Sequence, residues 1–162
     1  MEDNLNLSGL ASKPEGDIPM DKTRILFLCT GNSARSQMAE AFLKKYGGDR
    51  FDAYRAGVEA KGINPYTKRV MEEVGLSLSG QYSKNVKEYM GKVHFACLIT
   101  VCEEAEKACP TIFPGIGQRL RWSFEDPAAC EGSEDEKLAK FREIRDQIEQ
   151  QIKAWLKEQK AT

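Results

Sequence analysis

Residues 23–35 of the chain read T-R-I-L-F-L-C-T-G-N-S-A-R, an apolar run that passes directly into a short polar segment. The apolar residues at 25–28 predict a buried strand that ends beside Cys29. The segment 29–35 then places a cysteine and an arginine six positions apart, immediately before a helix-like stretch. A strand, a short loop and a helix in this order are typical of one unit of an α/β fold.

Loop 29–35 has the features of a pocket for a tetrahedral oxyanion. Gly31 can take a positive φ, and the next helix presents unpaired amides, so several N–H groups can point at one centre. Arg35 adds a planar guanidinium that can hold two oxygens at once. The same positive field is expected to favour the thiolate of Cys29, which is its nucleophilic form. These residues therefore predict an enzyme that attacks phosphate or an analogue of phosphate.

Length and charge exclude several other classes of protein. A chain of 162 residues is long enough for one domain with a core and too short for two of ordinary size. The 24 Lys and Arg residues balance 25 Asp and Glu, so neither nucleic acid nor an anionic membrane is a predicted partner. The first twenty residues lack a basic segment followed by an apolar one, and no long apolar segment exists, so we expect a cytoplasmic protein.

The cysteines also limit the interpretation. Five of them, unevenly spaced in a chain without a secretion signal, argue against a structural disulfide framework. There is no C-x2-C pair, and His94 is the only histidine. A zinc site would need scattered thiols as ligands, so we expect no metal and no bound cofactor.

Short apolar runs alternate with helix-like stretches from Thr23 onward, which predicts right-handed crossovers and a single-domain three-layer α/β sandwich with a four-stranded parallel sheet. Residues 1–21 are polar and aperiodic and are interpreted as a flexible extension, 22–158 as the catalytic domain and 159–162 as a tail. The predicted strands span 23–28, 51–56, 95–101 and 119–124. The predicted helices span 34–46, 65–75, 84–90 and 103–108, followed by a long amphipathic helix with Leu138, Phe141, Ile144, Ile148, Ile152 and Trp155 on one stripe.

A second group of thiols follows the buried strand at 95–101. Cys102 and Cys109 bracket E-E-A-E-K-A, six strong helix formers. Two turns of helix separate the two Cα atoms by about 10 Å along the axis, because each residue rises about 1.5 Å. A disulfide needs roughly 4.4–6.8 Å. The pair can close only if this short helix unwinds, which suits a redox relay better than a structural disulfide.

A carboxyl group is the third chemical element of the sequence. Asp126, in W-S-F-E-D-P-A at 122–128, follows the predicted fourth strand and is a candidate general acid toward a leaving oxygen. Asp-Pro is also an ordinary turn starter. Glu125 is a competing candidate, and the sequence does not decide which carboxyl turns inward.

These motifs together resemble the thioredoxin-coupled arsenate reductases built on the low-molecular-weight protein tyrosine phosphatase fold. The resemblance runs from about residue 23 to about 157 and is carried by C-T-G-N-S-A-R-S-Q-M-A-E at 29–40, A-G-V-E-A-K-G-I-N-P at 56–65, the Cys102/Cys109 pair and W-S-F-E-D-P-A. It implies a flavodoxin-like parallel sheet, an arsenate substrate, thioredoxin as the external reductant and a monomer. The substrate-binding residues that it implies are Thr30, Gly31, Asn32, Ser33, Ala34, Arg35 and Ser36.

The resemblance also implies a sequence of thiol exchanges. Cys29 would attack arsenate while Asp126 protonates the departing oxygen. Cys102 would then attack Cys29 and release arsenite, and Cys109 would attack Cys102 to leave a disulfide that thioredoxin reduces. A low-molecular-weight tyrosine phosphatase is the alternative, although Ala128 and Ala129 stand where those enzymes generally carry aromatic residues. A non-catalytic oxyanion sensor is a third reading, and it leaves the Cys102/Cys109 pair unexplained.

One departure from the family concerns potassium. Some relatives bind this ion beside the anion loop through four polar side chains, two of which match Asn32 and Glu40. Arg55 and Lys84 stand at the other two positions. A cation of the chain is expected to replace the charge of the metal beside Glu40, which predicts activity that does not depend on potassium.

Overall fold

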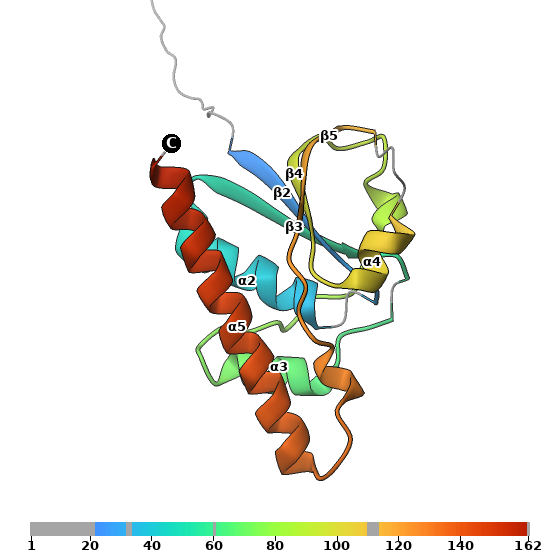
Figure 1. Cartoon of the computed structure of the whole chain (residues 1–162), viewed down its shortest axis with the longest axis vertical. Coiled ribbons are helices and arrows are strands. Elements are labelled where there is room, and N and C mark those ends of the chain that lie inside the picture. Colours follow the sequence, from blue (N-terminus) through green and yellow to red (C-terminus); the bar gives the residue numbers. More distant parts are fainter. Residues whose placement is uncertain (1–21, 32–33, 60, 110–113, 162) are drawn as a thin grey trace, which may run out of the picture.

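The computed structural model of the chain describes residues 22–31, 34–59, 61–109 and 114–161, and Figure 1 shows their arrangement. Four parallel strands form one sheet in the order β3-β2-β4-β5. Their bounds are β2 Thr23–Cys29, β3 Phe51–Gly57, β4 Phe95–Thr100 and β5 Ile116–Arg121. The predicted four-stranded parallel sheet is therefore confirmed.

The helices cover both faces of this sheet. Figure 1 shows α2 and the long α5 on one side of the strands and the short α4 on the other, which gives the predicted three layers. α3 lies beside α5 rather than on the strands. The helices are α2 Arg35–Gly47, α3 Pro65–Glu72, α4 Glu103–Ala108 and α5 Glu134–Ala161, and two single turns of 3₁₀ helix are η1 Val86–Glu88 and η2 Pro127–Ala129.

The apolar run of β2 lies at the centre of the core. Residues 25–28 are almost completely buried because the strand has neighbours on both edges and helices on both faces. Leu28 pairs with Ala56 on one side and with Thr100 on the other. This register brings the carboxyl ends of β2 and β4 to the same edge of the sheet, where ligands bind in folds of this kind.

The apolar stripe of α5 packs against the sheet side of the molecule as predicted. All six residues of the stripe are buried, and the ring of Trp155 lies 5.0 Å from that of Phe51 and 6.2 Å from that of Trp122. Burying a side chain of this size contributes about 1.5–3 kcal/mol. The Trp155 end of the stripe therefore packs at the start of β3, opposite Cys29, whereas Phe141 packs against Tyr66 of α3.

Some predicted boundaries were wrong. The fourth strand is β5 at 116–121 rather than 119–124. A glycine stands at position 117 of this strand because an added Cβ would lie 2.9 Å from the carbonyl oxygen of Ala96. Residues beyond β5 still follow β4, since the amides of Trp122 and Phe124 donate to Thr100 and Val101. Edge strands are poorly recognised from sequence because one side stays exposed.

The ends of two helices also differ from their predicted positions. α3 stops at Glu72, and the chain then turns through Gly75, whose φ of +82° is the left-handed conformation that closes a helix. α5 continues to Ala161, so residues 159–161, which were predicted to be a tail, extend the helix. The predicted flexible extension, 1–21, lies outside the described residues. No helix in the described part of the chain is long and apolar enough to cross a membrane.

Candidate active site

A cavity of about 440 Å³ opens at the carboxyl edge of the sheet, beyond β2 and β4. Its walls come from the end of β2, the start of α2, the segment after β3, the start of α4 and the turn η2. Arg35 and Lys61 supply positive charge, and Glu104 and Asp126 supply negative charge. The lining residues are Cys29, Thr30, Gly31, Ala34, Arg35, Lys61, Glu104, Asp126, Ala128 and Ala129.

The predicted oxyanion loop forms the floor of this cavity. α2 begins at Arg35, directly after Ala34, and its first amides face the loop as predicted for an anion site. Gly31 does not take a positive φ, which corrects the prediction for that residue. A glycine at this position leaves room for the side chain of Lys61, because an added Cβ would lie 3.3 Å from Cδ of Lys61. Asn32 and Ser33 lie outside the described residues.

Arg35 is buried and held in place from a distant segment of the chain. Its Nη1 donates a 3.0 Å hydrogen bond to the carbonyl oxygen of Phe124, and its Nη2 lies 3.9 Å from Oδ2 of Asp126. No acceptor among the described residues lies within hydrogen-bond distance of its buried Nε. A guanidinium fixed in this way presents a positive charge to the cavity without a change of rotamer.

The thiols of Cys29 and Cys102 lie close enough for each to shift the pKa of the other, although β2 and β4 are far apart in the sequence. Cys29 lines the cavity, and Cys102 is buried. The hydroxyl of Thr30 lies 3.2 Å from Sγ of Cys102, and the amide of Ala105 donates to the same sulfur at 3.4 Å. Cys102 is the N-cap of α4, so its sulfur lies at the positive end of that helix.

This arrangement shifts the pKa values of the two thiols in opposite directions. The Cys102 hydrogen bond and burial raise the pKa of Cys29 well above its usual value, although the Arg35 charge acts in the predicted, opposite direction. The hydrogen bonds that Cys102 accepts from Cys29, Thr30 and Ala105 lower its pKa to about 5. The pKa of Cys29 is thus raised and that of Cys102 lowered in this geometry, although the charge of Arg35 alone favours the thiolate of Cys29 as expected.

Cys109 lies at the other end of α4, as its C-cap. Its thiol is buried, and burial raises its pKa. Six helical residues separate it from Cys102, so the helix holds the two Cα atoms about 10 Å apart along its axis. All five cysteines are free thiols in this structure. The geometric condition predicted for the pair, a helix that must open before a disulfide forms, is present.

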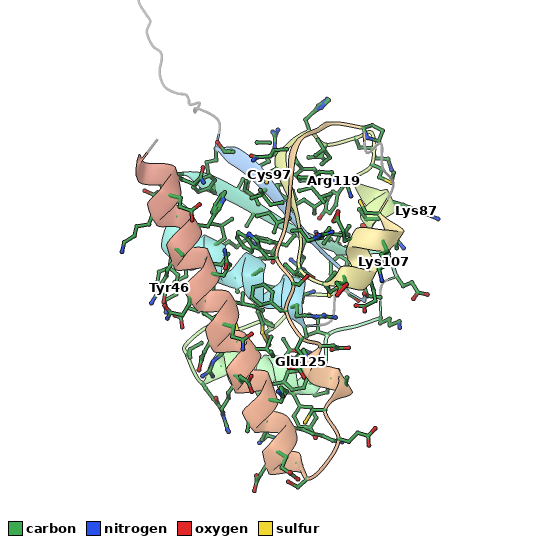
Figure 2. The ribbon with its side chains drawn as sticks, viewed as in Figure 1. Tyr46, Lys87, Cys97, Lys107, Arg119 and Glu125 are labelled. Atoms are coloured by element: carbon green, nitrogen blue, oxygen red, sulfur yellow. The ribbon has the colours of Figure 1, made fainter. Side chains whose placement is uncertain are left out.

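The structure distinguishes between the two candidate carboxyl groups. Asp126 lines the cavity, caps η2 through the amide of Ala128 at 3.0 Å and faces Arg35. Glu125 lies outside this cavity, with Oε1 3.3 Å from Nζ of Lys140 (Figure 2). Asp126 is the carboxyl group placed to reach a bound oxyanion.

The predicted loop residue Ser36 acts on Cys29. Its backbone amide donates a hydrogen bond to the sulfur of Cys29, which lowers the pKa of that thiol.

A buried ion pair lies behind the anion loop. Nη1 of Arg55 is 2.6 Å from Oε1 of Glu40, and Nη2 of Arg55 donates to the carbonyl oxygen of Tyr82. Nζ of Lys84 donates instead to the hydroxyl of Tyr89 at 3.0 Å. Of the two cations predicted to stand beside Glu40, the structure places Arg55 in that position. The described residues include no group of three or more His, Cys, Asp or Glu side chains that could hold a metal ion.

Two contributors to the site, Lys61 and Glu104, were missed by sequence reasoning and line the cavity. Thr30, a predicted residue of the substrate loop, also contacts the thiol of Cys102. Lys61 follows β3 and Glu104 opens α4, and both segments end at the same sheet edge as Cys29. That shared edge is the signal that would have selected them.

The chain is similar to known proteins in both sequence and structure. A model of the low molecular weight phosphotyrosine protein phosphatase family matches residues 24–162. An arsenate reductase of Halalkalibacterium halodurans is 45% identical over 137 residues, which make up 84% of this chain and 96% of that protein. A solved arsenate reductase in the phosphate binding state has 27% identity and a TM-score of 0.67, covering 84% of this chain and 98% of its own. A thioredoxin-dependent arsenate reductase of Corynebacterium glutamicum has 25% identity and a TM-score of 0.65, covering 90% of this chain and 66% of its own.

Proposed function

Because the chain belongs to the low molecular weight phosphotyrosine protein phosphatase family, we propose that it is the arsenate-reducing kind of member, converting arsenate to arsenite through Cys29, Cys102 and Cys109. The contact between the Cys29 and Cys102 thiols is the observation that carries this proposal. A phosphatase needs one nucleophilic cysteine, whereas a reductase needs a second thiol within reach of the first. The alanines at 128 and 129 give the cavity no ring to stack on a tyrosine.

The proposed chemistry begins with Cys29. Its proton must leave first, and the sulfur of Cys102 is the nearest base, because Cys29 already donates a hydrogen bond to it. Sγ of Cys29 then attacks arsenic, and Asp126 protonates the departing oxygen, which leaves as water. The amides of the loop and the Arg35 guanidinium hold the remaining oxygens. The product of this step is a sulfur–arsenic bond, with arsenic still as As(V).

Reduction occurs in the next step. Cys102 gives the proton that it took from Cys29 to an oxygen of the departing arsenite, and its Sγ attacks Sγ of Cys29. The sulfur–arsenic bond breaks, and its electron pair stays on arsenic. Arsenic becomes As(III) and leaves as arsenite, while the two thiols are oxidised to a Cys29–Cys102 disulfide. Cys109 then attacks Cys102 and releases Cys29. The Cys102–Cys109 disulfide is left for an external dithiol protein of the thioredoxin type, in line with the thioredoxin-dependent relative.

The compartment and assembly follow from this relay. We place the protein in the cytoplasm, because the three thiols must be kept reduced between turnovers. It acts as a monomer without a bound cofactor, because the three thiols of the relay belong to one chain and supply both electrons. Sedimentation at working concentration tests the monomer, and a dimer that dissociates only with loss of activity contradicts it.

A coupled assay tests the function. Arsenate-dependent consumption of reducing equivalents with thioredoxin is measured beside aryl phosphate hydrolysis. The intact protein is compared with Cys102→Ser, and Cys130→Ser, whose thiol lies outside the cavity, is the matched control. We expect reduction by the intact protein and by the control, and none by Cys102→Ser. Undiminished reduction in Cys102→Ser defeats the relay, and hydrolysis without reduction in the intact protein favours the phosphatase.

A further inference from the structure

Glu106 is fastened to the sheet from the middle of α4. Its Oε2 accepts a 2.9 Å hydrogen bond from the hydroxyl of Thr100, and its Oε1 lies 3.7 Å from Nη2 of Arg119. Thr100 is the last residue of β4, and Arg119 belongs to β5, where Figure 2 shows it near α4. We call Glu106, Thr100 and Arg119 together the Glu106 clasp. It connects the helix between two relay thiols to two neighbouring strands.

α4 has few other attachments. It is six residues long, far shorter than a helix that is stable by itself in water, and Ala105 is its only buried residue. The N-terminal end is held by Cys102, whose sulfur and carbonyl oxygen accept from the amides of Ala105 and Glu106. Glu106 is partly exposed, with a side-chain relative accessibility of 25%. The clasp is therefore a substantial part of what keeps α4 folded.

The second thiol exchange cannot take place while α4 is intact. Sγ of Cys109 must reach Sγ of Cys102, and a disulfide needs the two Cα atoms roughly 4.4–6.8 Å apart, whereas the helix holds them about 10 Å apart along its axis. Glu106 lies between the two cysteines, so unwinding the helix takes its carboxylate away from Thr100 and Arg119. The clasp is closed before the exchange and open during it.

We propose that Glu106 is a positioning residue that keeps α4 closed and thereby sets the rate at which the Cys29–Cys102 disulfide passes to Cys102–Cys109. The proposal rests on the relay described above. In the exchange, the Cys102–Cys109 bond forms, the Cys29–Cys102 bond breaks, and the proton of Cys109 is balanced by the proton that Cys29 takes up. No outside oxidant or reductant takes part.

Burial of the third thiol supports the same role. Burial is the largest cause that raises the pKa of Cys109, while the charge of Arg119 lowers that pKa and the charge of Glu106 raises it. Unwinding the helix exposes this thiol to solvent, so Cys109 becomes reactive only when it is also able to reach its target.

A rapid-quench experiment on the full chain tests the clasp. Reduced protein is mixed with arsenate without thioredoxin, quenched at intervals and alkylated, and the free cysteines are identified by peptide mapping. Alkylated Cys109 marks the first disulfide and alkylated Cys29 marks the second. Glu106→Gln removes the charge, and Thr100→Val removes the hydroxyl donor. Lys107→Gln is the matched control, because Lys107 is exposed on the same helix.

Removing the clasp is expected to accelerate the second exchange alone. In Glu106→Gln and Thr100→Val the transfer from Cys109 alkylation to Cys29 alkylation becomes about tenfold faster, the factor that corresponds to one hydrogen bond of about 1.4 kcal/mol. Arsenite release and the transfer in Lys107→Gln stay within about twofold of the unmodified protein. A helix that merely supported the site would slow arsenite release in the variants instead.

The outcomes separate this proposal from the proposed function. Arsenite release by the unmodified protein, with equal or slower transfer in both clasp variants, overturns the clasp and leaves the reductase standing. Absence of arsenite release by the unmodified protein overturns both. Faster transfer in the two clasp variants and not in Lys107→Gln supports the proposal.

Discussion

The oxyanion loop with α2 and the relay helix α4 meet at one sheet edge but are built in opposite ways. Nine of the thirteen residues of α2 are buried, against one of six in α4. Arg35 at the start of α2 is fixed by Phe124 and Asp126, whereas α4 is held mainly by its cap and the Glu106 clasp. Binding and attack on an oxyanion need groups that do not move, and successive thiol exchange needs a thiol that does.

The largest expected effects come from the two thiols that join these regions. Cys29→Ser removes the nucleophile, and arsenate reduction falls by more than about 10⁴-fold, as in other enzymes that lose their nucleophile. Cys109→Ser leaves the rigid region intact, so each molecule releases one arsenite and then stops. Steady-state assays measure the loss of reduction in Cys29→Ser, and single-turnover quantification of arsenite measures the release by Cys109→Ser. Repeated turnover by Cys109→Ser would break the distinction between a fixed and a mobile region.

Arg35→Lys tests how far the rigid region depends on a planar guanidinium. Lysine keeps the charge but loses the fork that contacts Phe124 and faces Asp126. We expect the second-order rate constant for arsenate to fall by about 10²–10³-fold, which matches the loss of one fixed oxyanion donor. The rate of the second thiol exchange, measured from preformed Cys29–Cys102 disulfide, stays the same. An equal loss in both steps would contradict the separation of the two regions.

The ion pair behind the loop is expected to affect stability more than chemistry. Arg55→Met leaves the buried carboxylate of Glu40 with Lys44, whose Nζ is 3.6 Å away, as its remaining cation. Breaking a buried pair costs about 3–5 kcal/mol, and Lys44 offsets part of this. Urea unfolding measures the loss, and Lys45→Met, an exposed change in the same helix, is the control. Equal stability of the two variants would show that the pair does not support the loop.

The shared proton of Cys29 and Cys102 gives a smaller, spectroscopic effect. Since the pKa of Cys102 is about 5, the reduced protein gains one thiolate as pH rises through that value, and ultraviolet absorbance increases. Cys102→Ala removes this transition. It also removes the largest cause that raises the pKa of Cys29, so the pKa of that thiol falls. Cys97 stays protonated at neutral pH because burial raises its pKa to about 11. A transition near pH 5 that survives in Cys102→Ala contradicts this assignment.

The smallest expected effect is that of potassium. Because Arg55 already places a positive charge 2.6 Å from Glu40, turnover at fixed ionic strength should be the same in sodium and potassium salts. A strong rise in turnover with potassium contradicts the prediction. Arg55→Met, assayed at a temperature at which it is folded, shows whether potassium becomes useful once the guanidinium is gone.

Sequence patterns predicted the buried, periodic elements better than the edge of the sheet. The run at 25–28 and the stripe of α5 are periodic, fully buried and therefore visible in the sequence. The edge strand β5 is half exposed, and its bounds were misplaced by three residues at each end. Alternation of strands and helices predicted a parallel sheet but not its strand order. The observed order β3-β2-β4-β5 places β4 beside β2 and brings Cys29 and Cys102 to one edge as expected.

The site was predicted by residue type but not by its interactions. Cys29, Arg35 and Asp126 line one cavity, and the choice of Asp126 over Glu125 needed the turn η2 to decide it. The lowered pKa of Cys102 was missed because it depends on Cys29, the hydroxyl of Thr30 and the amide of Ala105, which meet Cys102 only after folding. Similarly, the partners of Glu106 come from two strands, so the clasp is not visible in the spacing of the cysteines.

The central claim is that two electrons pass from the mobile pair by way of the fixed thiol to arsenate, and one stoichiometric measurement tests it. Reduced protein is mixed with excess arsenate in the absence of any other reductant, and arsenite and free cysteines are counted once the reaction stops. The account predicts one arsenite per molecule, a Cys102–Cys109 disulfide and an alkylatable Cys29. Arsenite formed while Cys102 and Cys109 both remain free thiols would contradict it.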